Sequence, residues 1–272
     1  MIVNYPRMRR RVKGWPNDLD TALEFASPEV FSISAPKNWD GKLEYTNGSE
    51  WKTWDGSAIA SGEIENNHCI YLRGTGNSKI TGVNSSNAKW NIIGTNIACN
   101  GNIDLLLDYS TVKSGNHPSL AGSCYSNMFQ GCTSLTAAPS LPATTLKDYC
   151  YYFMFQGCTS LTTAPSLPAT TLASSCYYSM FYGCTSLTTA PSLPATTLAS
   201  FCYNFMFRGC TSLKLSTTAS VTYTKSYRVP KSGTGTMAPN ALTNMFLNTG
   251  GTFTGTPEIN TTYYLDESNE IV

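Results

Sequence analysis

The feature that most constrains this chain is a unit of 26 residues that repeats in tandem. Copies begin at Cys124, Cys150, Cys176 and Cys202, and the second and third copies differ at only three positions. A fixed period of this length is typical of proteins built from stacked structural units. A unit this short cannot bury its own apolar face, so the core has to form between neighbouring copies. The sequence therefore predicts a stack of coils in which identical side chains are aligned.

The spacing of apolar residues inside the repeat predicts its local structure. Around the start of the second copy these residues lie four apart, which places them on one face of a helix: Leu146, Cys150, Met154 and Cys158. Gly157 is a suitable residue to end this helix. Pro165 and Pro168 exclude a helix from the next segment, which we expect to be extended, with Leu167 pointing inward. Each coil is thus expected to contain a short helix, a turn and an extended segment.

The first hundred residues show short strands separated by turn signals. Asn47-Gly48, a dipeptide typical of β-hairpin turns, joins the stretches KLEYT and SEWKTW. Residues 70–73 and 90–93 are predicted to form further strands. All five tryptophans lie in this part, and we expect most of them in its core. The pattern favours a small β-sandwich.

The chain divides by composition into five segments. They are a basic N-terminal arm (1–27), a β-sandwich-like domain (28–100), a capping helix and linker (101–123), the repeats (124–213) and a divergent C-terminal cap (214–272). No apolar stretch follows the basic arm, so a secretory signal is not expected. The helix is expected over residues 102–109, with Asp104 and Asp108 on one solvated face. The predicted fold class is α+β.

The repeat motif also resembles a known family. The pattern MFxGCTSLTxAPxLPATTLxxxCY is similar to the leucine-rich repeats of the BspA-like type, and two earlier stretches, NWDGKLEYTNGSEWKTWDG and IDLLLDYSTVKSGNHP, resemble segments that precede such repeats. The resemblance implies a short leucine-rich-repeat-like solenoid. It also implies adhesion, because such proteins occur on gut and oral bacteria and as presumed virion or tail components of their phages. Residues 214–272 depart from the pattern, except for the sequence NMF, which lies 39 residues after Met206.

Composition argues against several classes of protein. The net charge is +1 and charged residues make up only 13%, whereas nucleic-acid binding needs a basic face. No apolar run reaches the roughly 18 residues of a membrane span. The sequence lacks the G-x-S-x-G, P-loop and H-E-x-x-H motifs. We therefore expect no nucleic acid, no membrane insertion, no cofactor and no enzyme activity; an enzyme is the least favoured alternative.

The ten cysteines are expected to be buried thiols. The eight in the repeats alternate at spacings of 8 and 18 residues, and no pair has the close spacing of a zinc site. Disulfides between coils are the alternative, because aligned cysteines could approach bonding geometry. No metal site is predicted.

Positions that differ between copies are candidates for a binding surface. They follow the constant tyrosine of each repeat and include Ser126, Gln130, Tyr152, Phe153, Gln156, Tyr178, Tyr182, Asn204 and Arg208. We expect these side chains to face outward on the helical side. Tyrosine offers a large contact area at low entropy cost, which suits recognition. Relaxed constraint on solvent-facing positions is the alternative explanation.

These observations favour a non-enzymatic recognition protein of a virion or an extracellular surface. The first hypothesis is a phage virion or tail component that contacts a bacterial surface glycan or protein. The basic arm would then dock to other virion proteins. A bacterial cell-surface adhesin is the alternative, and self-association into a homo-oligomer is left open.

Overall fold

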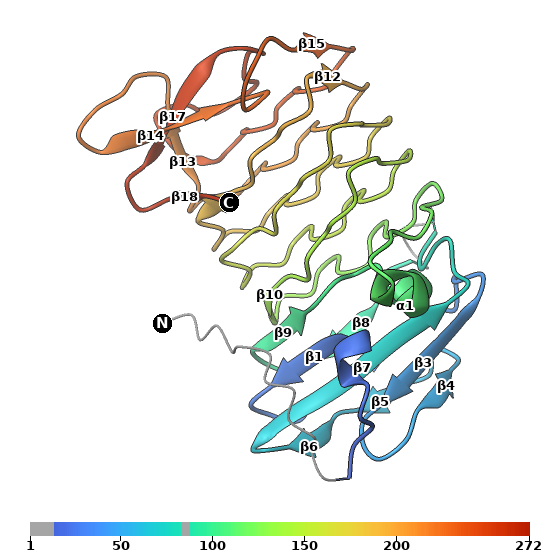
Figure 1. The fold of residues 1–272 in the computed structure, drawn as a ribbon. Coiled ribbons are helices and arrows are strands. Elements are labelled where there is room, and N and C mark those ends of the chain that lie inside the picture. Colours follow the sequence, from blue (N-terminus) through green and yellow to red (C-terminus); the bar gives the residue numbers. More distant parts are fainter. Residues whose placement is uncertain (1–13, 83–87) are drawn as a thin grey trace.

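The computed structural model describes residues 14–82 and 88–272, which form a β-rich N-terminal part and a stack of repeats (Figure 1). The larger N-terminal sheet has the order β10-β9-β1-β7-β3-β4, with β6 paired to β7. Its strands are β1 (Leu23–Ser27), β3 (Lys42–Thr46), β4 (Lys52–Trp54), β6 (Gly62–Ile64), β7 (Asn67–Thr75), β9 (Ile97–Asn100) and β10 (Leu135–Ala137). The smaller sheet consists of β5 (Ile59–Ala60), β2 (Ser32–Ser34) and β8 (Asn91–Ile93). The 3-10 helix η1 (Leu19–Thr21) precedes β1.

The predicted hairpin is confirmed. Strands β3 and β4 are antiparallel, with Leu43 opposite Trp54. Their connection spans residues 47–51, so the turn is longer than the expected two-residue Asn-Gly turn. The stretch 70–73 lies within β7, and 91–93 forms β8.

Aromatic rings fill the N-terminal core. The rings of Trp39 and Trp54 stack with centroids 5.4 Å apart, and Trp90 meets Trp54 edge-on at 5.2 Å. Phe25 of β1 lies 6.3 Å from Trp90 and 6.2 Å from Phe129 of the first repeat. The aromatic core therefore continues from the sheets into the repeats.

Helix α1 (Leu105–Lys113) packs on β7 through three buried leucines, Leu105, Leu106 and Leu107. A Cβ at Gly74 of β7 would lie 1.6 Å from the carbonyl oxygen of Leu106, so only glycine permits this approach. The helix is interrupted at Asp108, whose φ of −155° is extended.

The predicted helix in each repeat is wrong. In the first repeat, alternate amides donate to carbonyl oxygens of the second repeat at 2.8–2.9 Å: Tyr125 to Cys150, Asn127 to Tyr152 and Phe129 to Met154. The amides between them donate within the repeat to the carbonyl three residues earlier, as Ser126 does to Ser123. An α-helix would direct every amide to the carbonyl four residues earlier. The segment is instead a series of overlapping β-turns.

Left-handed residues set the period of these turns. Every fourth residue has a positive φ, as in Ser123 (57°), Asn127 (59°) and Gly131 (74°). We call such a segment a turn ribbon; the five turn ribbons are residues 123–132, 149–158, 175–184, 201–210 and 240–249. The apolar period of four is therefore real. It comes from a turn that repeats every four residues and not from a helix with 3.6 residues per turn.

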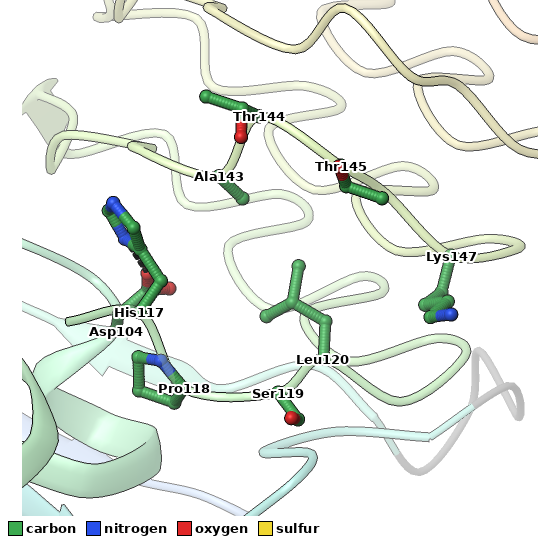
Figure 2. Close-up of a pocket in the computed structure, with 9 residues that line it drawn as sticks. All are labelled: Asp104, His117, Pro118, Ser119, Leu120, Ala143, Thr144, Thr145 and Lys147. Carbon is green, nitrogen blue, oxygen red and sulfur yellow. Dashed lines mark ion pairs between the residues drawn. The ribbon is translucent and has the colours of Figure 1, made fainter.

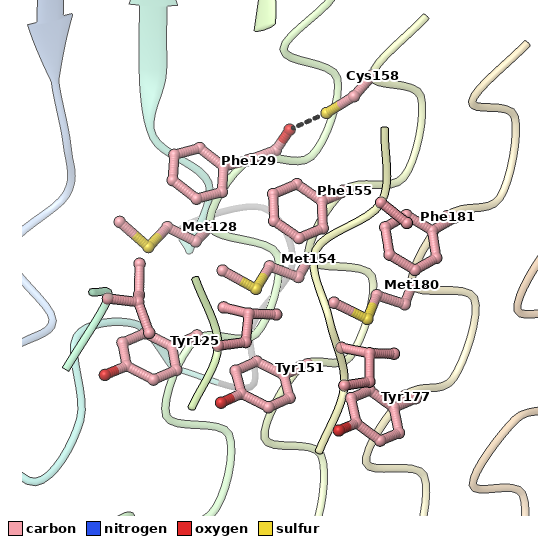
Figure 3. Close-up of a cluster of buried hydrophobic side chains, with 14 of the residues drawn as sticks. Tyr125, Met128, Phe129, Tyr151, Met154, Phe155, Cys158, Tyr177, Met180 and Phe181 are labelled. Atoms are coloured by element: carbon pink, nitrogen blue, oxygen red, sulfur yellow. Dashed lines mark hydrogen bonds between the residues drawn. The ribbon is translucent and has the colours of Figure 1, made fainter. Parts of the chain in front are cut away.

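Identical side chains form continuous ladders inside the stack (Figure 3). Neighbouring rings in the phenylalanine ladder, Phe129, Phe155, Phe181, Phe207 and Phe246, are 5.4–5.7 Å apart and inclined by 4–5°. Neighbouring rings in the tyrosine ladder, Tyr125, Tyr151, Tyr177 and Tyr203, are 5.6–5.7 Å apart. All these side chains are buried. The expected burial of each repeat against its neighbours is thus present.

The C-terminal residues supply the fifth turn ribbon and a small sheet. The amides of Tyr203 and Phe207 donate to Ala241 and Met245, so the NMF sequence occupies the predicted repeat position. The sheet has the order β14-β17-β13-β16: β14 (Tyr223–Arg228), β17 (Thr262–Asp266), β13 (Lys214–Ser216) and β16 (Gly250–Gly251). Two further parallel pairs join the repeats to this end: β11 (Thr189–Ala190) with β18 (Glu270–Ile271), and β12 (Thr197–Leu198) with β15 (Thr236–Met237).

The predicted α+β fold class is therefore wrong. The structure has 27% strand and 5% helix in several sheets, and the repeats do not close into a solenoid. Nor is there a separate sandwich, because β10 of the first repeat joins the N-terminal sheet and one hydrophobic core runs from Leu23 to Leu265. The proline-rich segments do not form a continuous ladder of strands, since Pro165 and Pro168 have no amide to donate. Leu167 is buried, as expected.

We expect Phe181→Ala to lower the free energy of unfolding by about 3–5 kcal/mol, because it removes the middle ring of a buried ladder. Urea unfolding followed by circular dichroism measures this change. Ser166→Ala, at an exposed position of the second repeat, is the control and should change the free energy by less than about 0.5 kcal/mol. Equal effects of the two substitutions would contradict the ladder.

Phe201→Asn should be more stable than Phe201→Ala. Phe201 has a φ of 56° and is 38% exposed, so a bulky side chain at the surface occupies a left-handed position. Asparagine tolerates this conformation, and we expect Phe201→Asn to be about 1 kcal/mol more stable than Phe201→Ala, which keeps the strain. Urea unfolding compares the two variants, and an Ala variant as stable as the Asn variant would contradict the left-handed assignment.

Candidate binding surface

The structure places the nine candidate residues in two groups. Ser126 and Asn204 are buried, so the expectation that they face outward is wrong. The Nδ2 of Asn204 donates to the carbonyl of Asn240 at 3.3 Å, which joins the fourth and fifth turn ribbons. The other seven are partly exposed: Gln130, Tyr152, Phe153, Gln156, Tyr178, Tyr182 and Arg208. Nε2 of Gln130 donates to Oε1 of Gln156 in the next repeat.

Aromatic side chains from three repeats meet on this side of the stack. Tyr152 stacks on Tyr178 with centroids 5.1 Å apart, and Phe153 meets Tyr178 edge-on at 5.5 Å. Tyr178 in turn contacts Phe205 at 5.9 Å. The guanidinium of Arg208 lies 5.3 Å from the ring of Tyr182 and 5.2 Å from that of Phe205. With Tyr149, 5.5 Å from Tyr152, these residues define the aromatic strip: Tyr149, Tyr152, Phe153, Tyr178, Tyr182, Phe205 and Arg208.

Three residues of the aromatic strip have left-handed backbones: Tyr149 (φ 59°), Phe153 (55°) and Phe205 (55°). A left-handed conformation costs an ordinary residue roughly 1–2 kcal/mol. Most equivalent positions in the turn ribbons hold serine or asparagine: Ser123, Asn127, Ser175, Ser179, Asn240 and Asn244. The exception is Phe201, which lies outside the strip. The bulky residues therefore occupy positions at which small polar residues cost less. Tyr149 and Phe205 were not among the nine candidates; the four-residue turn period would have identified them.

Tyr152 and Tyr178 are hydrogen-bonding groups of the strip. Partial burial raises the pKa of the Tyr152 and Tyr178 hydroxyls above the ordinary value, and Arg208 partly offsets this effect at Tyr178. Each phenol can therefore donate as well as accept a hydrogen bond.

A pocket of about 240 Å³ lies where the linker meets the first repeat (Figure 2). It is lined by Asp104, His117, Pro118, Ser119, Leu120, Ala143, Thr144, Thr145 and Lys147.

The expectation that Asp104 and Asp108 form a solvated pair is wrong. The side chain of Asp104 is 1% exposed, and its pKa is raised by burial. Asp108 instead accepts hydrogen bonds from Gly76, Ser110 and Thr111, which hold its pKa at about 2 despite partial burial.

All ten cysteines are buried free thiols. Three donate to the carbonyl of a phenylalanine in the preceding repeat at 3.0–3.1 Å: Cys158 to Phe129, Cys184 to Phe155 and Cys210 to Phe181. Burial raises the pKa of Cys132, Cys176 and Cys184 to about 12. Residues 14–82 and 88–272 contain no group of three metal-ligating side chains.

Comparisons with known proteins add no relative. No family model matches the chain, and searches of curated proteins and of solved structures found no similar protein. The BspA-like resemblance thus depends on the repeat motif and the two earlier sequence stretches, and it stays a prediction. In the described part of the chain, no helix has both the length and the apolar character needed to cross a membrane.

The buried thiols predict a loss of stability at alkaline pH. Their folded pKa of about 12 exceeds the value near 8.5 of an unfolded cysteine, so the unfolded chain releases protons first as the pH rises. This contribution to stability is complete below about pH 8 and declines between about pH 8.5 and 12. Urea midpoints measured in reductant at pH 7, 8, 9 and 10 should fall over the last two steps. A midpoint that does not change between pH 8 and 10 would contradict thiol burial.

Proposed function

We propose that this protein is a non-enzymatic recognition protein whose aromatic strip binds a target on a bacterial surface. The observation that carries the proposal is the aromatic strip itself, in which bulky rings occupy left-handed positions of the turn ribbons. Backbone strain of this kind persists where function requires a particular side chain, and it costs stability that serine or asparagine would preserve.

The chemistry of the repeats supports recognition. Residues 124–213 contain only three charged side chains, Lys147, Asp148 and Arg208. Interfaces favour tyrosine and arginine, and ordered rings lose little entropy on binding. Neutral phenols beside one guanidinium suit a hydroxyl-rich glycan or a polar protein surface, which are the two partner classes that we retain.

The protein is proposed to be a component of a phage virion or tail that contacts the host, because its repeat motif resembles that of such proteins. A bacterial cell-surface adhesin has the same support, and gene neighbourhood distinguishes the two: tail or capsid genes favour the virion, and secretion or sortase genes favour the adhesin. The basic residues of the arm, proposed to contact other virion proteins, precede residue 14 and lie outside the described residues. The raised thiol pKa values argue against cysteine nucleophiles, which need a lowered pKa.

Substitutions in the aromatic strip test the proposal. We expect Phe153→Asn/Phe205→Asn to weaken binding at least tenfold, because two rings are lost. The fold should remain, because asparagine occupies the same position in the first repeat. Fluorescently labelled protein on a panel of gut bacteria and their purified surface polysaccharides measures binding, by flow cytometry and on a printed array.

Ser166→Ala/Thr170→Ala, on exposed positions of the proline-rich segment, is the matched control and should bind like the unsubstituted protein. Tyr152→Ser/Tyr178→Ser/Tyr182→Ser should reproduce the loss. Undiminished binding by both strip variants, or no binding of the unsubstituted protein to any member of the panel, would contradict the proposal.

A further inference from the structure

We propose that the pocket at Asp104 is a second binding site, which takes one neutral sugar ring through hydroxyl contacts to the Asp104 carboxyl group. This inference adds the ligand class to the proposed recognition function, but the site is separate from the aromatic strip.

The buried carboxyl group of Asp104 has one oxygen atom without a hydrogen-bond donor. Its Oδ1 accepts a hydrogen bond of 3.0 Å from Tyr125, the first member of the tyrosine ladder. Its Oδ2 is buried without a hydrogen bond and lies 3.7 Å from Nδ1 of His117. Asparagine would accept from Tyr125 equally well, so the second oxygen is not explained by packing. A buried acceptor without a donor is costly, and a ligand hydroxyl would supply that donor.

The size and lining of the pocket select a small ligand. A volume of about 240 Å³ far exceeds the roughly 30 Å³ share of one water. It lies just below the usual range of drug-sized sites, which begins at about 300 Å³. Pro118, Leu120 and Ala143 supply apolar surface, while Thr144 and Thr145 supply hydroxyls (Figure 2). A sugar ring has the matching combination of C–H faces and hydroxyl edges.

The charges favour a neutral ligand. An ionised Asp104 would repel an anion, whereas the ammonium group of Lys147, which also lines the pocket, would repel a cation. A hydroxyl both donates and accepts, so it can pair with Asp104 in either protonation state. The pocket also lies between α1, the linker and the first repeat, a junction of the kind at which ligand sites are common.

The two histidines of the chain provide a direct test. Histidine-labelled full-length protein is titrated with glucose, galactose, mannose, rhamnose and N-acetylglucosamine, and the ring signals are followed by NMR. We expect at least one sugar to shift His117 saturably and to leave His68 unchanged. His68 is the internal reference, since it lies at the opposite end of β7 from the α1 contact at Gly74.

Asp104→Asn should weaken the sugar affinity measured from the His117 shift at least tenfold, while the asparagine still accepts the hydrogen bond from Tyr125. Asp148→Asn, next to Lys147 but outside the pocket, is the matched control. Thr144→Trp fills the pocket from an exposed position and should abolish the response without unfolding the chain. Phe153→Asn/Phe205→Asn should retain the response, which separates this site from the aromatic strip.

The inference is overturned if no sugar shifts His117, which would leave water as the pocket's occupant. It is also overturned if the shift persists in both Asp104→Asn and Thr144→Trp, or if acetate or putrescine shifts His117 while the sugars do not.

Discussion

Backbone hydrogen bonds between successive turn ribbons hold the repeats together. In the second, third and fourth ribbons, every second amide donates to the next ribbon, and the amides between them close the turns. All amides of these three ribbons are thereby used without a helix. Because the bonded residues are equivalent in each copy, like side chains stack on like. The phenylalanine and tyrosine ladders follow from this register, and so does the alignment of outward-facing rings in the aromatic strip.

The ends of the stack obey the same constraint. At the first repeat, the amides of Ile80 and Trp90 donate to Cys124 and Met128, so the N-terminal part covers one end. At the other end the fifth turn ribbon covers the fourth, and its left-handed positions are Asn240, Asn244 and Asn248. The C-terminal ribbon thus has the residue best suited to the backbone, whereas the inner ribbons have aromatic residues at some of the same positions. This contrast is the reason that we propose a function for the strip.

Much of the fold could be predicted, and the errors have definite causes. The hairpin at β3 and β4, the stacking of repeats and the NMF position were predicted because turn residues and repeat spacing are local signals. The helix was predicted wrongly because a four-residue turn period and a 3.6-residue helical period put apolar residues at nearly the same places over so short a segment. Burial of Ser126 and Asn204 was missed for the same reason, since a helix would present a different face.

The sequence by itself determined that the chain stacks in 26-residue steps, that the cysteines, phenylalanines and leucines shared by all copies form the core, and which positions vary between copies. These properties follow from repetition and from the spacing of apolar residues. Only the tertiary structure decided where the backbone amides point, because an amide can donate equally well to a carbonyl of its own coil or of the next coil. It also decided that Asp104 is buried beside His117 and Lys147, because that pocket forms only where three separate segments of the chain meet.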